Sequence, residues 1–194
     1  YELTDNNELS IHYYCKAKDA SIVNLTNHSY FNLNGHNSGT ILKHKMWIDS
    51  DSYTPTDRQL IPTGEIVNVE NTPMDFRQEK TVGQDINDDY EALKIATGYD
   101  HNYVLKGEGY RKVASLTADQ SNITMEVYTD TPGMQVYSGN FLDNESGKDN
   151  SVYQRQGGIC FETQYFPDAI NKEKFKSPII NKGDIMTSVT TYKF

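Results

Sequence analysis

Short runs in which apolar and polar side chains alternate are the feature that most restricts the fold of this 194-residue chain. About ten such runs occur, and turn residues separate them at short spacing. Residues 9–17 show the pattern, with an apolar residue at every second position. Because successive side chains of a strand point to opposite faces, each run predicts a half-buried strand. With almost no helical pattern elsewhere, the sequence predicts an all-β fold built as an antiparallel sandwich.

The runs also predict where individual elements lie. Residues 1–18 predict a hairpin with its turn at residues 5–7. The polar stretch 49–56 predicts a loop, and residues 78–95 form the only region with a helical pattern. Further strands are predicted at residues 21–26, 41–50, 65–69, 112–118, 123–129, 134–138, 154–166 and 185–194, of which 154–166 is expected to be central.

Composition bears on domain organisation and on partners. No internal repeat or clean linker is visible, so we expect residues 1–194 to form a single domain. The net charge of −9 argues against nucleic acid and anionic membranes as partners. No apolar run is long enough to span a bilayer, and no signal peptide is visible, so no membrane partner is expected. The 14 tyrosines suit sheets, and tyrosine also lines sugar-binding sites.

The chain has two cysteines, Cys15 and Cys160, which lie far apart and form no CxxC pair. No zinc or redox motif is therefore visible, and we expect both thiols to be reduced in a cytoplasmic protein. The acidic cluster at residues 85–91 does not have the spacing of an EF-hand calcium loop and indicates a solvated surface. We expect neither a metal nor a cofactor.

The stretch GGICFETQYFPDAI at residues 157–170 sets one carboxylate inside an apolar, aromatic run. In a strand, Glu162 would share a face with Cys160 and Gln164. A carboxylate among large apolar groups must find a hydrogen-bond partner, or its pKa rises, which suits a general base. A structural glutamate paired with a cation fits the same pattern. The residues alone leave both interpretations open.

Other polar residues on predicted strands could join Glu162 in a site. His28, Asp100 and Gln135 are candidates, although they lie far apart in the sequence. A site assembled from several strands would look like this, and so would unrelated residues. The chain contains no GxSxG, HExxH, P-loop or dinucleotide-binding pattern that would indicate a different chemistry.

Six motifs in a fixed order make the chain resemble the aldose 1-epimerases, also called galactose mutarotases. The resemblance covers nearly the whole chain, and it implies a large sandwich of two antiparallel sheets with a sugar-binding cleft on one sheet. The motifs are NLTNHSYFNLNGH (24–36), TPTDRQLIPTGEI (54–66), TPMDFR (72–77), GYDHNYVL (98–105), TPGMQVYSGNFLD (131–143) and GICFETQYFPDAIN (158–171).

The resemblance also implies an activity and residue roles. It implies an isomerase that interconverts the α and β anomers of free aldoses such as glucose and galactose, without a metal or cofactor. Glu162 matches the general base of the family and His28 its general acid. Asp100 and Gln135 match residues that hydrogen-bond the hydroxyl groups of the sugar. Neither a preferred aldose nor an oligomeric state is indicated.

The family places a further histidine and an arginine upstream of the NHSYF motif, and no position of this chain matches them. The chain starts at Tyr1 in a strand-like pattern, so we expect an upstream part of the sandwich to be missing. Two alternatives remain. One is a hexose-6-phosphate 1-epimerase, which needs basic residues around the cleft. The other is a sandwich domain that binds carbohydrate without catalysis.

Overall fold

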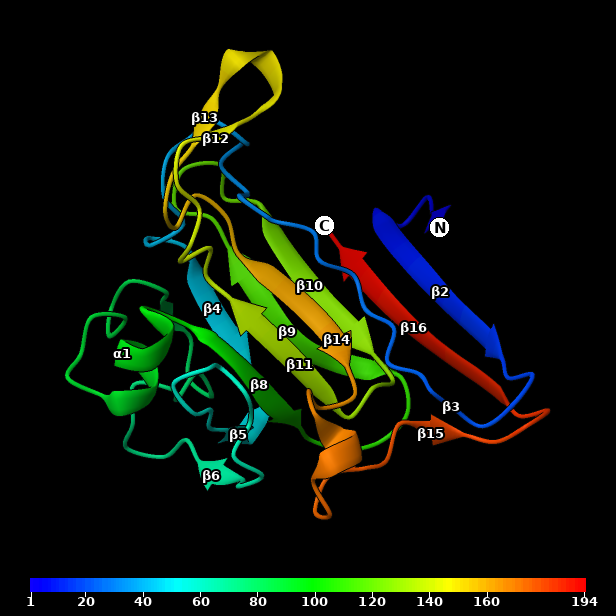
Figure 1. The fold of residues 1–194 in the computed structure, drawn as a ribbon. Helices are drawn as coiled ribbons and strands as arrows, with labels where there is room; N and C mark the ends of the chain where they lie inside the picture. The colour runs from blue at the N-terminus through cyan, green and yellow to red at the C-terminus, as the bar shows by residue number, and fades with distance from the viewer.

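A computed structural model describes residues 1–194 as a β-sandwich of two antiparallel sheets, which confirms the predicted all-β class (Figure 1). The seven-stranded sheet contains, in spatial order, β1 (Glu2–Leu3), β2 (Glu8–Lys16), β16 (Ile185–Lys193), β10 (Thr124–Thr129), β9 (Arg111–Thr117), β4 (Lys45–Ile48) and β7 (Lys80–Thr81). The five-stranded sheet contains, in spatial order, β14 (Cys160–Gln164), β11 (Gly133–Tyr137), β8 (Asp100–Leu105), β5 (Ser50–Thr54) and β6 (Val67–Asn68).

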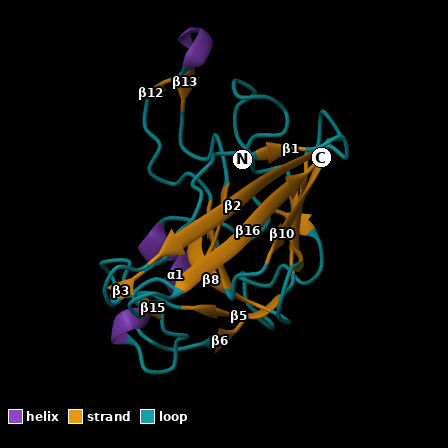
Figure 2. Cartoon of the chain, turned by 90° about the vertical axis from the view of Figure 1, so that its right-hand side faces the viewer, coloured by secondary structure: helices purple, strands orange, loops and turns teal.

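Smaller elements lie at the ends of the sandwich (Figure 2). None of the helices is both long and apolar enough to cross a membrane. The short strand pairs are β12 (Glu145–Ser146) with β13 (Val152–Tyr153), and β3 (Ser21–Ile22) with β15 (Ile179–Ile180). The helical segments are α1 (Glu91–Ala96), the 3₁₀ turn η1 (Lys148–Asn150) and the 3₁₀ turn η2 (Ala169–Asn171).

A core of 27 buried residues fills the space between the two sheets. Met134 and Phe161 enter it from the five-stranded sheet, and Val127 and Tyr192 enter it from the seven-stranded sheet. The Tyr192 hydroxyl donates a hydrogen bond to the carbonyl oxygen of Phe161 at 2.8 Å, which joins the sheets across the core. Since side chains alternate along a strand, burying Phe161 turns Glu162 to the opposite face.

The predicted hairpin at residues 1–18 is confirmed, and the predicted strands 112–118 and 123–129 form a second hairpin as β9 and β10, whereas the predicted loop at residues 49–56 is wrong. The predicted strand 41–50 is shorter than expected, because β4 begins only at Lys45. The chain then crosses to the other sheet and continues as β5, with Tyr53 in the core. The sequence did not predict this strand because most of its residues are polar. The hydroxyl of Ser50 is buried and donates to the carbonyl oxygens of Ser52 and Val104, so a serine-rich run can still lie inside a sheet.

The predicted helical region 78–95 also needs correction. Its helix, α1, begins only at Glu91 and ends at Ala96, and residues 80–81 form β7 instead. The backbone at Gly83 lies against Leu42 so closely that an added Cβ atom would come within 2.9 Å of the Leu42 carbonyl oxygen. Burial against β4 and its preceding turn therefore overrides helical propensity in this stretch.

The strand predicted at residues 154–166 is not central. The structure has only Cys160–Gln164 in the sheet, and this strand, β14, lies at its edge. The predicted strand at 21–26 is likewise reduced to Ser21–Ile22. The residues that follow run beside β14 and cover its outer edge instead of forming a full ladder with it.

Candidate active site

Three neighbouring strands bring three of the predicted site residues onto one face of the five-stranded sheet. In the strand register, Gln135 of β11 lies directly opposite Glu162 of β14. On the other side of β11, Tyr137 lies opposite Asp100 of β8. Because Gln135 and Tyr137 are two residues apart, all four side chains share a face, and it is the face turned away from the core.

Asp100 and Gln135 are joined directly. The Nε2 atom of Gln135 donates a hydrogen bond to the Oδ1 atom of Asp100 at 2.7 Å. Burial raises the pKa of Asp100, and the hydrogen bond from Gln135 and the charge of His28 oppose that rise. The oxygen of the same amide, Oε1 of Gln135, is buried and has no partner. An unsatisfied buried acceptor is costly, so this oxygen is suited to accept a hydrogen bond from a ligand.

His28 does not belong to any strand, and contacts on both sides of it hold it over β14. Before it, the side-chain amide of Asn24 donates to the carbonyl oxygen of Tyr165 at 3.0 Å and accepts from the Tyr165 N–H at 2.8 Å. After it, Phe31 and Ile159 exchange two backbone hydrogen bonds of 2.8 and 2.9 Å. These anchors lie at opposite ends of β14, so the segment between them passes along the whole strand.

The result is a close pair of an imidazole and a carboxylate. The Nε2 atom of His28 lies 3.4 Å from the Oε1 atom of Glu162, and the two side chains are 50% and 11% exposed. The structure therefore brings together residues that the sequence separates widely. Half of the imidazole remains open to solvent, so a ligand can reach the pair.

Burial sets the proton affinity of Glu162. Burial is the main reason that the pKa of this carboxyl is raised to about 7. The nearby His28 opposes the rise, and the Asp100 carboxylate adds to it. His28 is the only basic side chain within ion-pair distance of Glu162, and no lysine or arginine lies there. A structural ion pair of Glu162 could therefore involve only His28. A carboxyl that titrates near neutrality matches the requirement for general acid–base work.

Two tyrosines that the sequence did not single out complete the surroundings of His28. The Tyr30 ring centroid lies 5.2 Å from that of His28, and the Tyr137 ring meets His28 edge-on at 6.1 Å. Phe141 stacks on Tyr137 at 6.3 Å and is itself exposed. Alternation offered a signal for Tyr137, which is two residues after Gln135 in β11, but not for Tyr30, which lies outside any strand.

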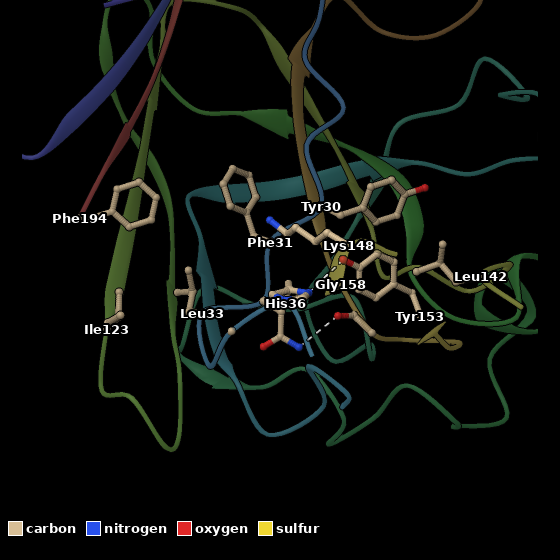
Figure 3. A pocket seen from close by; sticks show the side chains of 13 residues that line it. Tyr30, Phe31, Leu33, His36, Ile123, Leu142, Lys148, Tyr153, Gly158 and Phe194 are labelled. Carbon is tan, nitrogen blue, oxygen red and sulfur yellow. Dashed lines mark hydrogen bonds between the residues drawn. The ribbon is translucent and has the colours of Figure 1, made fainter. Parts of the chain in front are cut away.

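A cavity lies beside this site and has a different character (Figure 3). It is a cavity of about 580 Å³, and Tyr30 is the one side chain near His28 described above that also lines it. Its walls include Phe31, Leu33 and Phe194, and no carboxylate lines it. Its histidine, His36, shares a hydrogen bond of 3.1 Å with the hydroxyl of Tyr153. His36 also lies 3.5 Å from Asp149, but this carboxylate is exposed and does not line the cavity, whose walls are mostly apolar.

Comparisons with known proteins agree with this architecture. The family model described as aldose 1-epimerase matches residues 1–193. Galactose mutarotase of Homo sapiens is 41% identical over 192 residues, a match that covers 98% of this chain and 55% of that protein. Aldose 1-epimerase of Escherichia coli (strain K12) is 34% identical over 198 residues, covering 100% of this chain and 57% of that protein.

Solved structures show the same likeness. An aldose epimerase homologue from C. elegans superposes with a TM-score of 0.88 at 26% identity, over 97% of this chain and 56% of that one. Galactose 1-epimerase from Lactobacillus acidophilus gives a TM-score of 0.86 at 26% identity, over 100% of this chain and 55% of that one. The chain thus spans a little over half the length of these relatives. It belongs to the aldose 1-epimerase family.

Proposed function

We propose that this chain carries the acid–base pair of an aldose 1-epimerase, an isomerase that interconverts the α and β anomers of free aldoses such as glucose and galactose. The 3.4 Å approach of His28 to Glu162 supports the proposal most strongly. The pair lies on an open sheet face, beside hydrogen-bonding groups that suit a sugar. The activity names of the relatives, galactose mutarotase and aldose 1-epimerase, point the same way.

The proposed reaction needs two proton transfers. The Glu162 carboxylate removes the proton of the anomeric hydroxyl, and the electron pair of that O–H bond forms the carbonyl of the open-chain aldose. The bond between the anomeric carbon and the ring oxygen breaks, and protonated His28 delivers its proton to that oxygen. After rotation about the bond between C1 and C2, the roles of the two residues reverse, and the ring closes on the other face. Each such positioned group typically contributes ~10²–10⁴-fold to the rate.

Asp100 and Gln135 would bind and orient the sugar in this mechanism. The unpartnered Oε1 atom of Gln135 is ready to accept a hydrogen bond from a ring hydroxyl, and a carboxylate oxygen of Asp100 can accept another. Holding the sugar at two points fixes the anomeric carbon relative to both proton-transfer groups. The exposed rings near His28 offer an apolar surface to the face of the sugar.

Two broader proposals accompany the reaction. We propose a single domain for residues 1–194, since one core of 27 residues contacts both sheets. We also propose a cytoplasmic location, supported by the two free cysteines, Cys15 and Cys160, because free thiols are typical of reducing compartments.

Polarimetry of α-glucose and α-galactose tests the proposal. Glu162→Gln keeps the shape of the side chain and removes its basicity, so we expect mutarotation to fall by ~10²–10⁴-fold. Glu173→Gln changes an exposed glutamate in the same way and should leave the rate unchanged. Near-normal activity in Glu162→Gln would remove this carboxylate from the reaction. Binding of sugar without any rate enhancement in the unaltered protein would favour a carbohydrate-binding domain, and stronger inhibition by glucose 6-phosphate than by galactose would favour a phosphosugar epimerase.

A further inference from the structure

A third side chain with a reactive atom lies beside the His28–Glu162 pair, and the proposed reaction does not use it. Cys160 and Glu162 are alternate residues of β14, so their side chains share the site face. A ring nitrogen of His28, the sulfur of Cys160 and a carboxylate oxygen of Glu162 all lie within 4.8 Å of one another. Cys160 is fully buried and takes part in no disulfide.

Nitrogen, sulfur and oxygen atoms in this arrangement are the ligands of a thiophilic divalent cation. Zinc binds them at ~2.0–2.3 Å in tetrahedral geometry, which places neighbouring ligand atoms of one ion roughly 3.3–3.8 Å apart. The His28 and Glu162 atoms, at 3.4 Å, already have that spacing. No separation in the cluster is greater than 4.8 Å, so each exceeds that spacing by at most about 1 Å. His28 is half exposed, so its ring has room to turn towards the other two ligand atoms.

We propose that His28, Cys160 and Glu162 bind a thiophilic divalent cation such as Zn²⁺, and that the bound cation blocks the site against aldoses. On binding, the S–H bond of Cys160 breaks, its proton leaves to solvent, and a sulfur–zinc bond forms without any change of oxidation state. A protonated His28 likewise releases a ring proton to solvent, and the freed nitrogen lone pair and the Glu162 carboxylate become ligands at the same time. Neither can then move a proton, so the cation is an inhibitor that competes with the sugar. This second part rests on the proposed function, and the first part does not.

Cobalt(II) provides a test of binding that needs no activity. Titrating Co²⁺ into the Cys15→Ser protein leaves Cys160 as the only thiol. We expect one equivalent of Co²⁺ to bind with a thiolate-to-cobalt charge-transfer absorption band, and a chelator to remove the band. Absence of that band overturns the metal site. Mg²⁺ should not compete, because it prefers a site built from oxygen ligands.

Calorimetric titration with Zn²⁺ compares Cys160→Ser with the matched control Cys15→Ser. We expect the loss of one of three ligands to weaken zinc binding by at least ~10-fold in Cys160→Ser. The control should bind as the unaltered protein does. Equal affinity in both variants overturns the assignment of Cys160 as a ligand.

Steady-state mutarotation in the presence of Zn²⁺ tests the inhibitory part. We expect zinc to raise the apparent KM for the aldose and to leave kcat unchanged. The outcomes are distinguishable. A protein that binds cobalt through a thiolate but never accelerates mutarotation retains the metal site and contradicts the proposed function. An active protein without the cobalt band contradicts only the metal site.

Discussion

The two faces of the five-stranded sheet carry opposite kinds of residue on the same three strands. On the core face, Val136 lies between His101 and Phe161 in the strand register, and all three are fully buried. On the other face lie the polar groups Asp100, one residue before His101 in β8, and Glu162, one residue after Phe161 in β14. Neighbouring residues of one strand therefore have different tasks. The core face supplies a rigid support, and the other face presents at fixed spacing the polar groups for which we propose proton transfer and sugar binding.

Contacts on the core side hold the edge strand β14 in place, so it can position Glu162 against His28. Phe161 is locked into the core, and the hydroxyl groups of Thr163 and Thr190 form a buried hydrogen bond from β14 to β16. Glu162 lies between Phe161 and Thr163, which are both fixed in this way, so its backbone has little freedom. Site residues placed on a strand with such support keep their geometry better than residues on a free loop.

The largest expected effect tests whether His28 and Glu162 act as one unit on the site face. We expect His28→Asn and Glu162→Gln each to lower kcat by ~10²–10⁴-fold, and the double variant to be no worse than about the more damaging single change. The reason is that ring opening requires both proton transfers, so the second loss removes little. Polarimetric rates for all four proteins give the coupling. Losses that multiply in the double variant would mean that the two residues act independently.

The core face should respond to substitution through stability. Phe161→Ala removes a fully buried ring, and we expect the free energy of unfolding to fall by about 3–5 kcal/mol. Glu162→Gln, one residue away, should change it by less than about 1 kcal/mol. Denaturant titration of both variants measures the difference. Comparable destabilisation by the two substitutions would contradict the division of tasks between the faces.

His101 allows the core face to be tested by pH. Burial lowers its pKa to about 4, from an ordinary value of 6.5. The neutral ring is thus favoured in the folded protein, while the unfolded chain takes up a proton near pH 6.5. Its stabilising contribution is complete above that pH and declines, by up to about 1.4 kcal/mol per pH unit, as the pH falls from 6.5 towards 4.

The variant His101→Gln isolates this effect from other titrating groups. Unfolding free energies of the unaltered protein and the variant should depend on pH with different slopes between pH 6.5 and 4, the variant being the less steep. Equal slopes would mean that His101 titrates normally in the folded protein.

A smaller effect is expected on the site face at Gln135. Gln135→Leu removes the hydrogen bond to Asp100 and the free amide oxygen while keeping a similar volume. We expect KM for the aldose to rise roughly 10-fold, which corresponds to about 1.4 kcal/mol, with a smaller change in kcat. Initial rates over a range of sugar concentrations separate the two constants. A large loss of kcat at constant KM would place Gln135 in the chemical step instead.

The sequence predicted which residues of a single strand share a face better than it predicted how the strands and loops come together. Alternation along residues 157–170 correctly placed Cys160, Glu162 and Gln164 on one face, because a strand has a period of two. It could not give the order of strands, so the register of Gln135 opposite Glu162 came only from the fold. His28 lies outside any strand, and side-chain contacts of Asn24 with Tyr165 help to set its position. No periodic pattern encodes such a contact.

Polar content caused the main failures in predicting the fold. β5 has the sequence SDSYT, in which only Tyr53 is apolar, and the hydroxyl of Ser50 is satisfied by carbonyl oxygens that the sequence does not reveal. The six motifs identified the family, since their order is far more specific than any single pattern. Alternation placed Cys160 beside Glu162, but the approach of His28 to both was invisible, because His28 lies on a distant segment.

A crystal structure of the protein with bound galactose tests the central claim most directly. The account predicts that the sugar lies on the open face of the five-stranded sheet. Its anomeric hydroxyl should be within ~2.6–3.2 Å of the Glu162 carboxylate, and its ring oxygen should face Nε2 of His28. A sugar bound instead in the apolar cavity lined by Phe31, Leu33 and Phe194, away from both residues, would contradict it.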